Sequence, residues 1–295
     1  MVLDSNVDPR DVWYRLNLNQ DIAFEQVIQL WFGWIARHHS VYHLGRTAYA
    51  VQKMFYRQKA HLQRKPARGI VGPDEWVDAF TFAAYAQFLW PDLAKVFAGW
   101  VHDRHGRALV RAYRNYDTPG DDNLFAVYNA VECTDARWPH SWAKWNRDNS
   151  RITQFAPFFT WANAWFNASC RVWPARAGTP VRVAGHDVAA LLIDETLDAA
   201  TPFQGSLEVR SRFRRSSLIA VRGGTTHAST PFLSSDCTND LIARYLKRGQ
   251  LPPRRSGRRA DISCQPLPEP QAGNAPNTVS RPFERLLVSM HRWGP

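Results

Sequence analysis

A strand–helix–strand pattern in the last third of the chain constrains the fold more than any other stretch. Residues 189–193 form a short apolar run, and residues 218–221 form a second one that ends just before Gly223 and Gly224. A helix-like segment extends between them from Thr201–Pro202 to Arg212. Apolar runs bounded by turn residues are typical of buried parallel strands, and their alternation with a helix indicates a βαβ unit. We therefore expect an α/β fold.

Two side chains follow these predicted strands: Asp198 comes after the first and His227 after the second. Functional groups collect beyond the carboxyl ends of parallel strands, so both are expected at the same edge of the sheet. A buried carboxylate fixes the tautomer of a neighbouring histidine and stabilises its imidazolium, as in a Ser-His-Asp triad. In α/β hydrolases the acid also precedes the histidine along the chain. The alternative is a surface aspartate and a loop histidine that never meet.

Six longer sequence segments resemble those of one protein family. They are VLDSNVDP (2–9), YNAVECTDARWP (128–139), TWANAWFNASCRVWP (160–174), ETLDAATPFQGSLEVR (195–210), GGTTHA (223–228) and a final segment ending in CQPLPEP (264–270). In this order they resemble the secreted bacterial tripeptidyl aminopeptidases, which are serine peptidases of the α/β-hydrolase fold with a TAP-like C-terminal region. The resemblance implies Asp198 as the triad acid, His227 as the triad base, a peptide substrate and no cofactor or metal.

The family's nucleophile lies in a G-x-S-x-G motif upstream of a segment like VLDSNVDP, and the chain contains no such motif. Gly205–Ser206 lacks a second glycine at the required offset. We therefore expect the C-terminal part of an α/β hydrolase, truncated at its N-terminus and inactive alone. The missing N-terminal half is a candidate partner. Two alternatives remain open: a non-catalytic remnant or binding partner, and an esterase or epoxide hydrolase of the same fold.

The resemblance also suggests how the chain is divided. We expect a residual core strand in residues 1–10, a helical cap in 11–178, a TAP-like core segment in 179–265 and a flexible tail in 266–295. Apolar residues at three- and four-residue spacings predict the helices of the cap. Residues 2–3 are apolar, and the strand they form would lack its neighbour, leaving one edge of the sheet unpaired.

An aminopeptidase binds the free α-amino group of its substrate, and a buried acid in the cap would serve that purpose. Glu132 and Asp135, within VECTDARWP, are the candidates. The alternative for each residue is an ordinary helix-end or salt-bridge role. The 12 tryptophans of residues 11–178 likewise fit either inter-helix packing or the aromatic wall of a substrate site.

Four cysteines, at positions 133, 170, 237 and 264, are too widely spaced for a zinc site. They allow three disulfide pairings, and the sequence alone does not choose among them. The family resemblance favours Cys133–Cys170 in the cap and Cys237–Cys264 in the C-terminal segment. Such bonds form in an oxidising compartment.

The chain is strongly basic, with a formal net charge of +11 among 295 residues. The basic residues are spread through helices and tails without a nucleic-acid-binding motif, so we expect no nucleic-acid partner. No run of 18 apolar residues predicts a membrane span, and MVLDSNVDPR does not resemble a signal peptide. A secreted location is implied by the family alone.

Overall fold

The computed structural model describes residues 1–273 apart from 118, 121 and 186. The chain divides into two compact units. The first comprises Met1–Val27, Cys133–Thr160 and Cys170–Pro268; the second comprises Ile28–Glu132, Trp161–Ser169 and the chain from Glu269 on. Three α-helices, Tyr14–Arg37, Asp122–Asp135 and Thr160–Phe166, contain residues of both units, so the units do not follow the boundaries expected from the sequence. The assignment of residues 11–178 to a cap stays a prediction.

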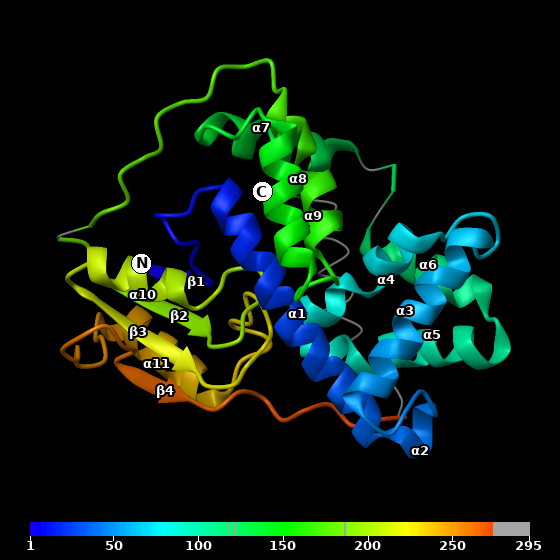
Figure 1. The fold of residues 1–295 in the computed structure, drawn as a ribbon. Coiled ribbons are helices and arrows are strands. Elements are labelled where there is room, and N and C mark those ends of the chain that lie inside the picture. The colour runs from blue at the N-terminus through cyan, green and yellow to red at the C-terminus, as the bar shows by residue number, and fades with distance from the viewer. Residues whose placement is uncertain (118, 121, 186, 274–295) are drawn as a thin grey trace. The chain divides into compact units, whose positions relative to one another are not determined.

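The first unit is built on a parallel sheet with the strand order β1-β2-β3-β4 (Figure 1). The strands are β1 (Val2–Asp4), β2 (Ala190–Glu195), β3 (Ser216–Val221) and β4 (Ile262–Cys264). All six residues of β2 and of β3 are buried, which explains why both read as continuous apolar runs. The predicted βαβ unit is confirmed, and the pairing of β1 with β2 places the first residues of the chain in the same sheet.

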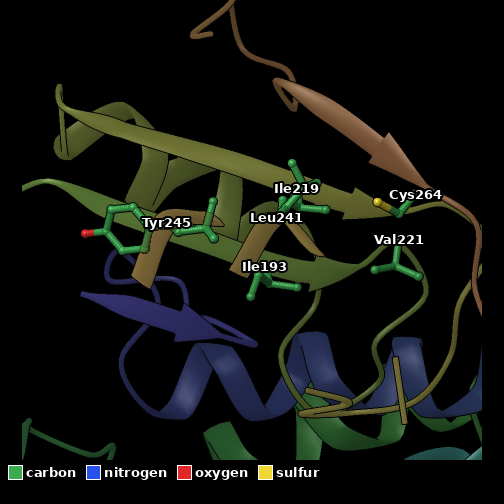
Figure 2. Close-up of a cluster of buried hydrophobic side chains, with 7 residues drawn as sticks. Ile193, Ile219, Val221, Leu241, Tyr245 and Cys264 are labelled. Atoms are coloured by element: carbon green, nitrogen blue, oxygen red, sulfur yellow. The ribbon is translucent and has the colours of Figure 1, made fainter. Parts of the chain in front are cut away.

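Two helices lie against this sheet, α10 (Gln204–Arg212) and α11 (Asp236–Arg248). Alternate residues of β2 point to opposite faces. Leu191 and Ile193 pack with Leu241 and Tyr245 of α11 (Figure 2), whereas Leu192 packs on the other face in a cluster that contains Leu207 and Val209 of α10. The result is a three-layer α/β arrangement of the α/β-hydrolase type. Helix α11 ends at Gly249, whose positive φ of 66° matches the predicted glycine C-cap.

The remaining helices confirm the predicted helical character of residues 11–178. They are α1 (Tyr14–Arg37), α2 (His39–Tyr42), α3 (Ala48–Arg64), α4 (Pro73–Tyr85), η1 (Gln87–Leu89), α5 (Trp90–Asp103), α6 (Gly106–Tyr116), α7 (Asp122–Asp135), α8 (Trp142–Thr153), α9 (Thr160–Phe166) and η2 (Ala168–Arg171). In the second unit, Trp31, Phe55, Trp76, Phe80 and Phe97 form a buried aromatic cluster with ring centres 4.7–6.3 Å apart. For Trp31 and Trp76, inter-helix packing is therefore the role observed.

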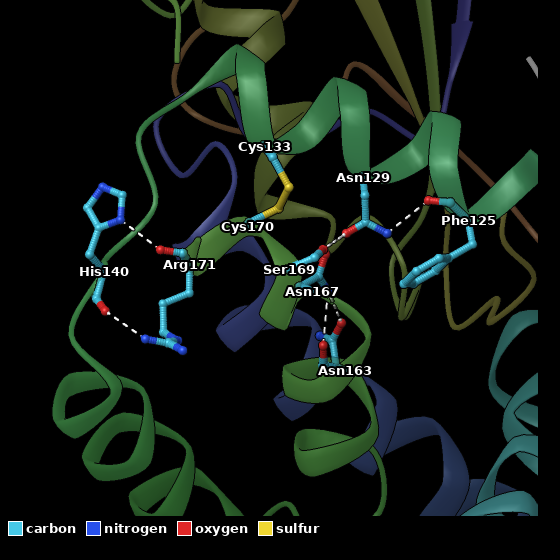
Figure 3. The surroundings of a disulfide bond; sticks show 9 residues. All are labelled: Phe125, Asn129, Cys133, His140, Asn163, Asn167, Ser169, Cys170 and Arg171. Carbon is cyan, nitrogen blue, oxygen red and sulfur yellow. Dashed lines mark hydrogen bonds between the residues drawn. A yellow bond between two sulfur atoms is a disulfide. The ribbon is translucent and has the colours of Figure 1, made fainter. Parts of the chain in front are cut away.

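Both predicted disulfides are present. Cys133–Cys170 connects the end of α7 to η2, beside a group of asparagines that bond to helix backbone (Figure 3). Cys237–Cys264 connects α11 to β4 across the face of the sheet. The second bond explains how a three-residue strand at the sheet edge is held in place.

A buried ion pair fixes the other side of β3. Arg210 of α10 and Asp261 are 4% and 0% exposed, and the guanidinium donates to both carboxylate oxygens at 2.6 and 2.7 Å. Asp261 also accepts from the backbone N–H groups of Leu218 and Arg255. This one carboxylate therefore connects α10, β3 and the loop that precedes β4.

The described part of the predicted flexible tail is held against the second unit. Arg37 donates twice to the Glu269 carboxylate, and the indole of Trp34 donates to the carbonyl of Pro270 at 3.1 Å. These polar contacts anchor residues 269–270, and the flexibility of the tail stays a prediction. Residues 274–295 of the tail lie outside the described residues. In the described part of the chain, no helix combines the length and apolar character that a membrane crossing requires.

Candidate active site

The structure brings Asp198 and His227 together at the carboxyl edge of the sheet. Asp198 lies three residues beyond β2, and His227 lies six residues beyond β3. The imidazole Nδ1 is 2.9 Å from Asp198 Oδ2 and 3.2 Å from Oδ1. The Asp198 side chain is fully buried, whereas the His227 side chain is 28% exposed. This is the geometry in which an aspartate orients an imidazole and leaves its other edge to react.

The Asp198 carboxylate is held by its own turn. Its Oδ1 accepts from the backbone N–H groups of Ala200 and Thr201 at 2.8 and 2.9 Å, and Oδ2 accepts from the Thr201 hydroxyl at 3.1 Å. Burial raises the pKa of Asp198, but the attraction of His227 and these hydrogen bonds outweigh burial and hold the pKa below its usual range. Burial lowers the pKa of His227, and the neighbouring carboxylates, Asp198 first, raise it above its usual range.

Hydrogen bonds connect the loop that carries His227 to residues at the ends of β1 and β2. The backbone N–H of Thr226 donates to Glu195 Oε2 at 2.7 Å, and that of Gly223 donates to the Thr196 hydroxyl at 2.8 Å. From β1, the Ser5 hydroxyl accepts from the N–H of Ala228, and the Asp4 carboxylate accepts from the N–H of Thr230. These bonds fix the backbone on both sides of the imidazole.

Two further carboxyl groups lie buried at the end of β2. Burial, with nearby carboxylates adding to it, raises the pKa of Glu195 to about 8, and burial also raises the pKa of Asp194 well above its usual range. With a pKa of about 8, Glu195 is largely protonated near neutral pH, which limits the negative charge around Asp198. A Cβ on Gly224 would lie 2.2 Å from Glu195 Oε2, so only glycine fits there. This contact gives a physical reason for the Gly223–Gly224 pair.

The structure also places the serines nearest to the pair. Ser5 contributes to the lowered pKa of Asp198 and accepts from Ala228, so it supports the acid and the histidine loop. A triad nucleophile bonds the imidazole at Nε2, on the opposite edge from the acid. Ser206 is buried in α10, where its hydroxyl donates to the Asp194 carboxylate at 2.5 Å. Ser206 is therefore not placed to act as the nucleophile. The hydroxyl groups of Ser5 and Thr201 thus support Asp198 by hydrogen bonding, whereas that of Ser206 bonds to Asp194 instead.

The two acids proposed for amino-group recognition differ in their surroundings. Both lie on α7, where Glu132 is buried and 7% exposed, whereas Asp135 is exposed. The Glu132 carboxylate adds to the effect of burial in raising the pKa of the neighbouring Tyr128. The expectation of a buried acid therefore holds for Glu132 alone. No set of three or more His, Cys, Asp or Glu side chains suited to a metal ion occurs among the described residues.

Sequence reasoning selected Asp198 and His227, which the structure brings into contact, but it missed Asp4, Ser5 and Glu195. A signal was available, because all three polar residues end a predicted strand, where Asp198 and His227 also lie. Their role as acceptors for the histidine loop requires the relative placement of β1, β2 and residues 223–230, which only the structure supplies.

The chain is similar in sequence to several known proteins. Residues 156–277 match the family described as TAP-like protein. The chain is 40% identical over 279 residues to the tripeptidyl aminopeptidase of Streptomyces lividans, a match that covers 92% of this chain and 51% of the relative. It is 26% identical over 268 residues to carboxylesterase B of Mycobacterium tuberculosis, covering 86% and 50%. The serine protease Hip1 of the same organism is 26% identical over 201 residues, covering 64% and 37%. The chain spans about half the length of the first two of these relatives.

Proposed function

Because this chain belongs through residues 156–277 to the TAP-like family of α/β hydrolases, we propose that it supplies the acid and the base of a serine peptidase. Asp198 is the acid and His227 the base. The observation that carries the proposal is the 2.9 Å contact between the buried Asp198 carboxylate and His227 Nδ1. The serine and its oxyanion donor come from a segment that precedes residues like these in the family.

The proposed reaction is acyl transfer in two steps. The serine hydroxyl attacks the carbonyl carbon of a peptide bond while His227 Nε2 takes its proton. Collapse of the tetrahedral intermediate breaks the C–N bond, and the imidazolium returns that proton to the leaving amine. Water, activated by the same imidazole, then hydrolyses the acyl-enzyme. Asp198 stays ionised throughout, consistent with its lowered pKa, and stabilises the imidazolium.

For the substrate we propose a peptide with a free N-terminus, from which a tripeptide is released. The 40% identical Streptomyces lividans relative, a tripeptidyl aminopeptidase, supports this choice. We further propose Glu132 as the carboxylate that recognises the α-amino group, because it is buried and anionic groups bind ammonium. Changing Glu132 to Gln in an active assembly is expected to abolish the preference for free over blocked N-termini. The same change at exposed Asp135 is the matched control, and an unaltered preference in E132Q rejects the role.

The strand β1 suggests how the missing segment joins. Backbone bonds from Leu191 N–H to Met1 O and from Ser5 N–H to Ile193 O show which residues of β1 face β2. The N–H and C=O groups of Val2 and Asp4 therefore point to the other edge, where no backbone partner occurs in the described part of the chain. We propose that a strand ending in G-x-S-x-G pairs there. Residues 11–178 would then form the cap, 179–265 the rest of the core, and 266–295 a tail.

We propose that the protein works in an oxidising compartment outside the cytoplasm. Both disulfides close loops of the folded chain, and such bonds are kept reduced in most cytosols. Peptide mapping without reductant of protein recovered from its natural source tests this location, since free thiols at all four cysteines would contradict it.

The direct test is reconstitution of the nucleophile. The chain is refolded with the N-terminal half of the Streptomyces lividans relative and exposed to a serine-directed fluorophosphonate probe. We expect labelling and hydrolysis of a free tripeptidyl p-nitroanilide only in the mixture, and loss of both with His227→Ala. If the probe labels the chain alone at one of its own residues, the inference that the chain lacks a nucleophile is wrong. Labelling of the mixture that survives H227A would refute the role of His227.

An esterase is the second candidate, and the match to carboxylesterase B favours testing it. The same assembly is compared on p-nitrophenyl butyrate and on the tripeptidyl anilide. Faster turnover of the ester with no cleavage of the peptide would assign the esterase instead. A binding role without catalysis follows if the refolded assembly forms and is inert towards the probe.

A further inference from the structure

A basic pocket lies in the second unit, and none of the residues that line it belongs to the candidate active site. It has a volume of about 710 Å³ and is lined by residues of α3, α5 and α6 and by the segment after α3. Pockets of this size are typical of sites for small organic ligands. Five of the lining side chains are permanently cationic: Lys65, Arg68, Arg104, Arg107 and Arg111.

These cations have no anionic partner in the described part of the chain. None of the residues that line the pocket is an aspartate or a glutamate, and none of the five cations forms an ion pair there. Arg104 interacts only with neutral groups, donating to Gln58 at 2.9 Å and lying 5.2 Å from the ring centre of Trp100. Concentrating five like charges around one cavity costs free energy unless a ligand compensates them.

The arrangement of the arginines is suited to a compact anion. Arg107 and Arg111 are four residues apart on α6 and therefore lie on one face of that helix. Gly106 begins this helix, and a Cβ there would lie 3.2 Å from Arg68 Cγ, so Arg68 comes directly against the start of α6. The positive end of the helix dipole adds to the charge at this point. Basic side chains from separate segments thus line the same pocket.

We propose that this pocket binds a small organic anion that carries two or more adjacent phosphate groups. Guanidinium groups bind phosphate oxygens in pairs, and four of the five cations are arginines. A single phosphate would leave most of the charge uncompensated, whereas a diphosphate or triphosphate matches it. His61, His105 and Trp100 also line the pocket and offer ring surface for the organic part. The site is independent of the proposed peptidase activity.

Titration calorimetry of the oxidised full chain tests the proposal, with pyrophosphate and ATP as probes at about 0.15 M ionic strength. We expect both to bind with a dissociation constant below about 1 mM, weakening at higher salt. Arg107→Gln and Arg111→Gln should each weaken binding about tenfold, the loss expected for a hydrogen bond to a charged group. Arg68→Gln, on a different segment, should do the same if the two walls share one ligand.

Arg114→Gln is the matched control, because Arg114 is an exposed arginine of the same helix that does not line the pocket. It should change the affinity by less than about twofold, and circular dichroism should show all variants folded. Equal weakening by R114Q would mean that the probes sense only net charge, and the proposal fails. It also fails if hexaglutamate binds as tightly as pyrophosphate, or if neither phosphate probe binds. Tighter binding of a single-stranded oligonucleotide, lost equally in R114Q, would indicate a nucleic-acid surface instead.

Discussion

Glu195 provides the sharpest test of how the histidine loop is held. Its carboxyl is 4% exposed, accepts the N–H of Thr226 and lies against Gly224, and its pKa is raised to about 8. In the unfolded chain the same group titrates near 4.5. Folding at neutral pH therefore requires Glu195 to take up a proton. Glu195→Gln keeps the shape and an acceptor oxygen but removes the titration.

The size of the effect follows from linkage. Between the unfolded and folded pKa values the folded state binds one more proton, so stability falls by about 1.4 kcal/mol for each pH unit gained. From about pH 6 to about pH 7.5, the free energy of unfolding of wild type should fall by about 2 kcal/mol, and E195Q should not show this loss. Asp4, Asp194, Asp198 and His227 also act on this site, but they are common to both proteins and cancel in the difference.

Urea unfolding of the oxidised protein at the two pH values, followed by fluorescence and near-UV circular dichroism, measures this difference. Glu269→Gln is the control. The Glu269 side chain is half exposed, so this substitution removes the same charge from a surface position. Between the two pH values, the free energy of unfolding of E269Q should change by the same amount as that of wild type. If E195Q also runs parallel to wild type, Glu195 is ionised in the folded protein and the explanation of the loop is wrong.

Three further changes test the framework of the sheet. Asp261→Asn removes one partner of the buried pair with Arg210 and should cost about 3–5 kcal/mol in urea unfolding. Replacing Cys237 and Cys264 together by Ser opens the loop between them and should cost about 3 kcal/mol by the same assay, whereas reductant should then cause no further loss from that bond. Gly205→Ala places a Cβ 2.3 Å from a neighbouring carbonyl oxygen, so a lower melting temperature is expected, and an unchanged one would show that α10 shifts without cost.

The sequence predicted those elements whose signal is local. Buried strands β2 and β3 appear as apolar runs, and the helices appear through their periodicity and caps, such as the Thr47 hydroxyl that accepts from Ala50 N–H at the start of α3. Strand β4 was missed, since only Cys264 of its three residues is buried and its position depends on pairing with β3 and on the disulfide. The choice between disulfide pairings likewise needed the family resemblance, because spacing alone does not bring distant cysteines together.

The candidate site shows the same limit. Asp198 and His227 were predictable because each follows a strong strand, and parallel strands place their carboxyl ends at one edge. The exposed position of Asp135 was not, because helix α7 buries only one of the two acids three residues apart and the sequence did not say which face is covered. The shared pocket of Lys65, Arg68 and Arg111 was also hidden, since it depends on the packing of α6 beside the segment that follows α3.

The supports of His227 bear on what a reconstituted enzyme needs. Asp4, Ser5, Glu195 and Thr196 hold the loop from two adjacent strands, and all belong to one compact unit of this chain. The position of the imidazole relative to Asp198 is thus set without any contribution from a serine segment. A complementing segment has only to pair along β1 and present a hydroxyl and an oxyanion donor. Since β1 ends at Asp4 and Ser5 follows it directly, pairing on the outer edge of β1 should also stabilise two of the residues that hold the loop, so binding of the segment and ordering of the base should reinforce each other.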